Sequence, residues 1–280
     1  MTIVLAGFLM GCSDDEPQTV RQESNPEKMS MPNDQWHFFP CTMGEDQAFI
    51  YLNTGIAEEM GSAPANLVEI RLAYQAPNEN GLPTNEEFQP VNEIEDRIEA
   101  FSEEERDWYV GRVTVGGHRI FFVYTSREES VWEGFIKKLG SQSGYELLVS
   151  YSDDPEHKGY FNDLYPSADD WQIIKDLEVI EQLGEHGDDG SAKRKVDHWL
   201  FFKDKESAKG FVAWAESDRF TEETEYSHET DDGRYCVRLY HHGTLKIGDI
   251  GNHTVALRRK AEEFGGEYDG WETPVVKSSE

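Results

Sequence analysis

The sequence predicts an α+β protein made of two ferredoxin-like β-α-β-β-α-β sandwiches, each an antiparallel sheet with helices on one face. Its length of 280 residues suits two domains. Short segments of alternating hydrophobicity are interleaved with segments of helical periodicity, and each half contains one hairpin signal at a glycine turn. We expect three regions, with boundaries at residues 1–34, 35–166 and 167–280.

The first region, residues 1–34, is expected to be a lipoprotein-type signal followed by a flexible tether. Residues 2–10 are apolar and uncharged, and Leu9-Met10-Gly11-Cys12 resembles a bacterial lipobox, in which Cys12 would be lipidated. No Lys or Arg precedes the apolar run, which departs from a secretory signal unless the true start codon lies upstream. We therefore expect an envelope lipoprotein attached to the membrane, with a disordered cytoplasmic N-terminus as the alternative.

The second region shows the clearest alternation of strand and helix patterns. Thr84 with Glu87, and Ser126 with Glu129, predict capping boxes at the starts of two helices. Gly116-Gly117 between two alternating runs predicts a tight hairpin, because both glycines tolerate positive φ. The expected strands cover 36–39, 48–53, 67–74, 108–115, 118–125 and 145–151.

This region resembles the bacterial family of unknown function 695. The resemblance rests on Gly81-Leu82-Pro83, on the Gly116-Gly117 hairpin with Phe122 and Tyr124, and on residues 153–166 with Tyr160 and Tyr165-Pro166. It implies no activity, because the family has none assigned.

The third region repeats the same order of elements. A helix stripe over 171–183 is followed by an acidic, glycine-rich loop at 184–192. Residues 196–202 are apolar on both faces, which predicts a central strand. Further strands are expected at 220–228, 235–242 and 268–276, and further helices at 208–215 and 250–264, the last of which should stop at Gly265.

This third region resembles the RraB family, regulators that bind and inhibit ribonuclease E. The resemblance rests on Leu183 with Gly187-Asp188, on Val196-Asp197-His198 before Phe201-Phe202, and on the run from Glu267 to Thr273. It implies a protein-binding regulator, with ribonuclease E as the implied partner. The candidate contact residues are Asp197, His198, Tyr268, Asp269 and Trp271. Packing of the two large aromatics in the last strand would explain the final run without any partner contact.

The charge balance restricts the partners. A formal net charge of -30 repels phosphate backbones, so we expect no direct binding of nucleic acid. The charge suits a basic protein partner, although adaptation to high salt would give the same composition. No apolar run is long enough to span a membrane, so attachment is expected only through a lipid on Cys12.

The sequence carries none of the common catalytic or metal-binding motifs, and we predict no enzyme activity, cofactor or metal. His241-His242, with His228 opposite, is the only weak metal candidate. The carboxylates Glu103 to Glu105, and Asp188 with Asp189, are expected to be solvated surface charges. An enzyme of unrecognised type would require a concave site that gathers His198, His241 and carboxylates.

Three functional interpretations remain. The first is an RraB-like regulator of ribonuclease E, the second is an envelope lipoprotein that binds an unknown partner, and the third is an enzyme of unrecognised type. The first two conflict in location, because ribonuclease E works in the cytoplasm whereas a lipidated Cys12 would place the protein outside it.

Overall fold

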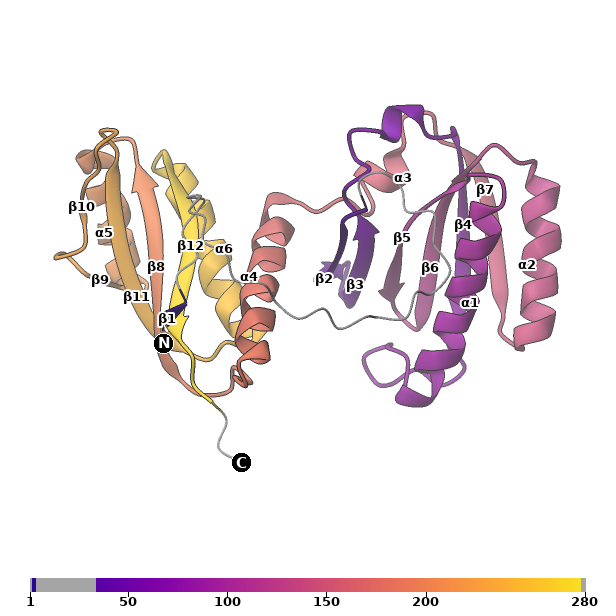
Figure 1. The fold of residues 1–280 in the computed structure, drawn as a ribbon, viewed down its shortest axis with the longest axis horizontal. Coiled ribbons are helices and arrows are strands. Elements are labelled where there is room, and N and C mark those ends of the chain that lie inside the picture. The colour runs from indigo at the N-terminus through magenta and orange to yellow at the C-terminus, as the bar shows by residue number, and fades with distance from the viewer. Residues whose placement is uncertain (1, 4–33, 278–280) are drawn as a thin grey trace, which may run out of the picture. The chain divides into compact units, whose positions relative to one another are not determined.

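The computed structural model describes residues 2–3 and 34–277, which fall into two compact units (Figure 1). The first unit comprises residues 34–170, and the second comprises residues 171–277 together with Thr2–Ile3. Each unit has an antiparallel sheet and helices, so the predicted α+β class is confirmed. Cys12 and the expected tether lie outside the described residues.

The first unit contains one six-stranded sheet in the order β2-β3-β5-β6-β4-β7, with every pairing antiparallel. Its strands are β2 (Trp36–Met43), β3 (Asp46–Asn53), β4 (Asn66–Ala73), β5 (Trp108–Val115), β6 (His118–Thr125) and β7 (Leu147–Asp153). Its helices are α1 (Asn85–Glu103), α2 (Glu129–Ser143), α3 (Lys158–Phe161) and the 3-10 turn η1 (Met60–Ser62).

The main core of this unit lies between α1, α2 and one face of the sheet. Val68, Ile70 and Leu72 alternate along β4 and are fully buried against the helices. The apolar stripes of α1 and α2 meet them at helical spacing, with these buried members: Val91, Ile94, Ile98, Trp132, Ile136 and Leu139. The two-residue period of the strand and the 3.6-residue period of the helices therefore determine which face of the sheet packs against which face of each helix.

The hairpin predicted at Gly116-Gly117 is present between β5 and β6, and both glycines have positive φ, 55° and 81°. The two predicted capping boxes are wrong. Thr84 is the N-cap of α1 but its side chain makes no capping bond, and the Glu87 carboxylate accepts instead from the backbone amides of Gln75 and Ala76. The N-cap of α2 is Glu128, not Ser126.

A buried ion cluster fastens α1 to the sheet. The Glu95 carboxylate accepts hydrogen bonds from the Tyr109 hydroxyl at 2.8 Å, from Arg112 Nε at 2.6 Å and from Arg119 Nη1 at 2.8 Å. Arg119 also donates to Asn92 at 2.9 Å. Because Glu95 and Arg119 are almost fully buried, each requires the other to stay compensated.

The second unit has a sheet in the order β1-β12-β8-β11-β10, with β9 also paired to β11. Its strands are β1 (Thr2–Ile3), β8 (Arg194–Phe202), β9 (Thr221–Glu222), β10 (His228–Glu229), β11 (Tyr235–Gly243) and β12 (Gly266–Pro274). Its helices are α4 (Ala168–Glu185), α5 (Lys205–Ser217) and α6 (Ile247–Glu263). The predicted central position of β8, between β11 and β12, is confirmed.

The strand expected over 220–228 is broken. It forms only β9 and β10, because a turn intervenes in which the amides of Tyr226 and Ser227 donate to the Glu223 carbonyl. The predicted end of α6 before Gly265 is confirmed, since Gly265 has a φ of 69°.

The four principal strands of the first unit lie in the order β7-β4-β6-β5, and those of the second in the order β12-β8-β11 followed by the broken edge. The name ferredoxin-like sandwich stays a prediction, since β2 and β3 extend the first sheet and the second has a discontinuous edge strand. None of the helices within residues 34–277 combines the length and apolarity needed to cross a membrane.

Candidate functional site

The alternation of side chains along β8 sorts the candidate residues of the second unit onto two faces of its sheet. His198 points with Val196 and Leu200 towards the helices, whereas Asp197 and Trp199 point to the opposite face. In Figure 1, α5 and α6 lie against one side of this sheet, where they bury the core. The candidates that are adjacent in sequence therefore cannot form one site.

We call the face without helices the open sheet face. It comprises side chains of β8, β11 and β12 and of the turn between β9 and β10: Lys195, Asp197, Trp199, Glu223, Tyr226, Arg238, Tyr240 and Glu272.

Arg238 lies at the centre of the open sheet face. Its guanidinium pairs with Glu223 at 2.8 Å, with Glu272 at 3.2 Å and with Asp197 at 3.3 Å. The same guanidinium lies over the Trp199 ring at 4.7 Å and the Tyr226 ring at 4.5 Å. Two aromatic rings and three carboxylates therefore hold one cation in place.

Lys195 extends this network towards the edge of the sheet. Its ammonium contacts Asp197 at 2.7 Å and Glu223 at 2.5 Å, and it lies 4.7 Å from the centre of the Tyr240 ring. Three carboxylates and two cations leave the cluster with one excess negative charge. Arginine and large aromatics are the residue types that dominate binding energy at protein interfaces.

The helix-facing candidates are interior residues. His198 is fully buried, and its Nδ1 lies 2.8 Å from the Tyr268 hydroxyl. Its Nε2 lies 2.8 Å from Nδ1 of His241, which is 6% exposed. Burial and the neighbouring imidazoles hold the pKa of His198 well below its ordinary value.

Trp271 is buried as well, and its indole nitrogen donates to the Asp176 carboxylate at 2.9 Å. Thr254 and Gln172 donate to the same carboxylate, at 2.5 Å and 2.9 Å. Burial raises the pKa of Asp176, and the three hydrogen bonds oppose that rise. These contacts join α4, α6 and β12, so Trp271 has a structural role. Asp269 alone among the five candidates is exposed.

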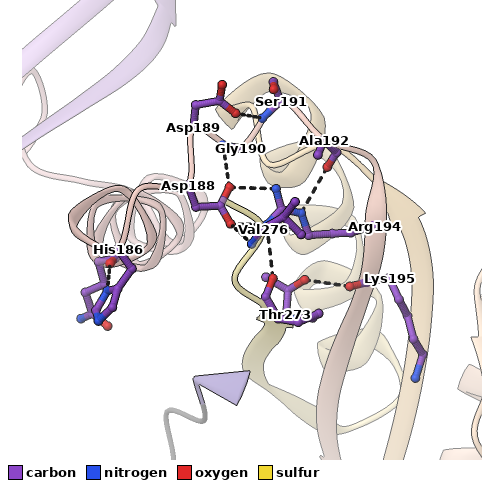
Figure 2. Close-up of polar contacts among 12 residues, drawn as sticks. His186, Asp188, Asp189, Gly190, Ser191, Ala192, Arg194, Lys195, Thr273 and Val276 are labelled. Atoms are coloured by element: carbon purple, nitrogen blue, oxygen red, sulfur yellow. Dashed lines mark hydrogen bonds and ion pairs between the residues drawn. The ribbon is translucent and has the colours of Figure 1, made fainter. Parts of the chain in front are cut away.

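A second buried polar cluster holds the end of β12, as Figure 2 shows. Asp188 forms a bidentate ion pair with Arg194 and also accepts the Val276 amide at 2.8 Å. Arg194 donates in turn to the Pro274 carbonyl at 3.2 Å. The prediction that Asp188 is a solvated surface charge is therefore wrong, whereas Asp189 is exposed as expected.

The Asp188 pair is electrostatically well compensated. Burial would raise the pKa of Asp188, but hydrogen bonds from Arg194, Val276 and Gly190 outweigh it and lower the pKa to about 2. The carboxylate is therefore charged under all ordinary conditions. Its position in the turn after α4 explains why Gly187, with a φ of 82°, precedes it.

The three histidines proposed as a weak metal site do not come together in the structure. His241 points inward while His242 is exposed, and His228 lies opposite Cys236 instead of opposite either. Across residues 2–3 and 34–277, no three His, Cys, Asp or Glu side chains are arranged to hold a metal ion. A hollow of about 410 Å³ beside α5 contains none of the candidate residues; its lining includes Lys205, Lys209, Val212, Glu216, Glu222 and Tyr235.

With this geometry in place, comparison with protein families separates the two units. Residues 34–165 match the model of a family described only as a family of unknown function, DUF695. Residues 173–273 match a different family model, described as regulator of ribonuclease activity B. The second unit matches RraB.

Both predicted resemblances are thereby confirmed over these ranges. No curated protein matches the chain significantly. The RraB match covers β8, β11 and almost all of β12, and with them the whole open sheet face. RraB is a regulatory family and not a catalytic one, which fits the predicted lack of enzyme activity over residues 173–273, while the family that matches residues 34–165 is described only as one of unknown function.

Several structural residues were missed at the sequence level. Asp176, Arg194 and Glu95 act through partners distant in the chain, and their local sequence gives no sign of it. A signal was available for the open sheet face, because the alternation of Lys195, Asp197, Trp199 with apolar residues already predicts that these three share a side.

Proposed function

We propose that the chain is a non-enzymatic regulator whose RraB-like unit binds a ribonuclease, with ribonuclease E as the candidate partner, through the open sheet face. The RraB match supports the regulatory role. The Arg238 cluster supports the open sheet face as the binding site. In this cluster a cation, three carboxylates and aromatic rings lie together on the side of the sheet without helices.

The chemistry of this face suits protein recognition. Trp199 and Tyr226 offer large rings, and Tyr226 is 44% exposed. The ion pairs keep the carboxylates and cations in fixed positions before a partner arrives, which lowers the ordering cost of binding. The net charge of -30 favours a basic segment of the partner by long-range attraction.

The test uses the full chain and immobilised ribonuclease E, with a parallel assay of RNA cleavage. The wild type should be retained at low salt and should slow cleavage. Trp199→Ala and Tyr226→Ala should each weaken binding about tenfold or more, because truncation of an interface anchor costs upwards of about 1.4 kcal/mol.

Phe88→Ala is the matched control, because Phe88 is an exposed aromatic on α1 in the other unit. It should bind as the wild type does. Failure of the wild type to bind would remove ribonuclease E as the partner, and unchanged binding by both open-face variants would remove this face as the site.

A second function is favoured by Leu9-Met10-Gly11-Cys12: an envelope lipoprotein whose RraB-like unit binds a partner outside the cytoplasm. Cells fed a labelled lipid precursor should then label the wild type but not Cys12→Ala, and fractionation should move that variant from membrane to soluble fractions. Labelling of the wild type would exclude a cytoplasmic ribonuclease as the partner. Absence of label, with the wild type in the cytoplasmic fraction, would exclude the lipoprotein.

A further inference from the structure

A chain of imidazoles crosses the interior of the second unit near the middle of β8. Tyr268 of β12, His198 of β8 and His241 of β11 are linked by two contacts of 2.8 Å. The His241 ring continues the chain to His253 of α6, with ring centroids 4.1 Å apart. The chain thus connects three neighbouring strands with the helix that covers them.

The hydrogen-bond count of this chain allows no more than one extra proton. With neutral imidazoles, two matched pairs of tautomers place one hydrogen in each link: either His198 donates from Nε2 to His241 and accepts from Tyr268, or His241 donates from Nδ1 to His198, which then donates from Nδ1 to Tyr268. Two cationic imidazoles would place two N–H groups head to head at the contact between His198 and His241. The far nitrogen of His241, Nε2, is buried and has no hydrogen-bond partner among the described residues.

The surroundings of the chain contain little that would stabilise even one added charge. Phe220 packs edge-on against all three imidazoles, at centroid distances between 5.6 and 5.8 Å. Within residues 34–277, neither His198 nor His241 forms a hydrogen bond or an ion pair with a carboxylate.

The titratable groups that act on the chain come from every neighbouring element. On the helix side, Asp218 after α5 and Asp249 of α6 act on His253 only. His242 of β11 acts unfavourably on a protonated His241. On the side of β12 and α4, burial raises the pKa of Tyr268, and Asp176 and Asp269 raise it further, so its hydroxyl keeps its proton.

We propose that this histidine chain is an acid-sensitive lock: it holds β8, β11, β12 and α6 together while its imidazoles are neutral, and proton uptake loosens the packing between these elements. The proposal concerns the stability of the second unit. It therefore does not depend on which partner, if any, the open sheet face binds.

The direction of the pH effect follows from burial. Burial and the neighbouring histidines lower the pKa of His198 well below 6.5 and that of His241 to about 4. A group whose pKa is lowered on folding stabilises the fold above its unfolded value, near 6.5, and loses that contribution as the pH falls towards the folded value. The lock is therefore closed at neutral pH and weakens below about pH 6.5.

Hydrogen exchange of the full chain at pH 7.5 and 5.5, corrected for intrinsic exchange rates, measures the opening directly. For peptides from β8 and β11, the opening equilibrium constant should rise about tenfold for each imidazole that stays neutral in the folded unit. Peptides from β5 and β6 of the other unit provide the internal reference and should change less.

His241→Gln keeps a hydrogen-bonding side chain but cannot titrate in this range, so it should remove about one of these tenfold factors. His228→Gln is the matched control, because His228 is exposed and outside the chain, and it should retain the full pH response. An equal pH response in the His241 variant and the wild type would overturn the proposal.

A second measurement keeps the test decisive if His241→Gln does not fold. Imidazole nitrogen and carbon resonances of the wild type should show His198 and His241 neutral at pH 5.5, with the exposed His186 as the reference for a solvent-facing ring. Protonation of both buried rings near pH 6.5 without loss of structure would overturn the lock.

Discussion

The indole nitrogen of Trp271 donates a hydrogen bond of 2.9 Å to the carboxylate of Asp176, which lies 95 positions earlier in the chain. This contact anchors β12 to α4 and gives the most distinctive run of the second unit an interior role. A variant that loses Trp271 would weaken partner binding by disturbing the fold alone. Binding is therefore better tested at Trp199, on the opposite face of the sheet.

We predict that Trp271→Phe destabilises the second unit by about 1–3 kcal/mol, because the ring is kept while a buried carboxylate loses one donor. Urea unfolding followed by circular dichroism measures the change. Trp199→Phe, on the open sheet face, is the control and should cost less. Equal stabilities for Trp271→Phe and the wild type would show that Thr254 and Gln172 satisfy Asp176 without the indole.

Asp188→Asn should destabilise the second unit by about 3–5 kcal/mol, since it leaves Arg194 buried without its charge partner. The exposed neighbour supplies the control, and Asp189→Asn should stay within about 0.5 kcal/mol of the wild type. Both are measured by chemical denaturation at pH 7, and a small effect for both would contradict the structural role of the pair.

Because of the same ion pair, we predict that the second unit loses stability in acid. The folded pKa of Asp188, about 2, is below its ordinary value of 3.8, so the unfolded chain takes up the proton first as the pH falls. The pair therefore stabilises the fold fully above about pH 4 and loses this contribution between about pH 4 and 2. Asp188→Asn should lack this dependence, and an unchanged pH profile in the variant would refute the assignment.

In the first unit, Glu95→Gln should cost about 3–5 kcal/mol, because Arg112 and Arg119 lose the carboxylate that compensates them. Asp96→Asn alters the neighbouring, exposed carboxylate of the same helix and should change stability by less than about 0.5 kcal/mol. Thermal and urea unfolding of the full chain would measure both. Similar values for the two variants would mean that the buried cluster contributes little.

Gly111 and Gly134 form a second matched pair. A Cβ at Gly111, where β5 bulges, would lie 2.5 Å from the Tyr51 carbonyl oxygen, so Gly111→Ala should destabilise by about 1–3 kcal/mol. A Cβ at Gly134 in α2 meets nothing within 4 Å, so Gly134→Ala should stabilise by about 0.5–1 kcal/mol. The midpoint of unfolding should fall for Gly111→Ala and rise for Gly134→Ala. Equal shifts of the two midpoints would contradict the close approach at Gly111.

The elements predicted well were those whose signal is local and repeated. Alternation placed β4, β8 and β11 to within a residue or two, and the Gly116-Gly117 turn fixed the pairing of β5 with β6. Along β8, the same alternation places Asp197 and His198 on opposite faces of the sheet. Local patterns succeed here because burial on one face of a strand requires a period of two.

The failures involve interactions between residues far apart in the chain. Glu87 was expected to cap α1, but the amides of Gln75 and Ala76 compete for its carboxylate. Asp188 has the same local sequence context as its exposed neighbour, Asp189. Only the contacts with Arg194 and Val276 distinguish it as a buried residue. Such partners are brought together only by the complete fold, so no spacing rule identifies them.

The interruption between β9 and β10 has a consequence for self-association. An uninterrupted edge strand presents a regular row of free amide and carbonyl groups on which another molecule can add a strand. Here the outer edge of β11 is covered by two short pieces and a turn, with the Glu223 amide donating to the Arg238 carbonyl. Two copies of this unit therefore present only two-residue strands to each other at this edge. Such short strands disfavour the pairing of strands between molecules, which is a common route to aggregation.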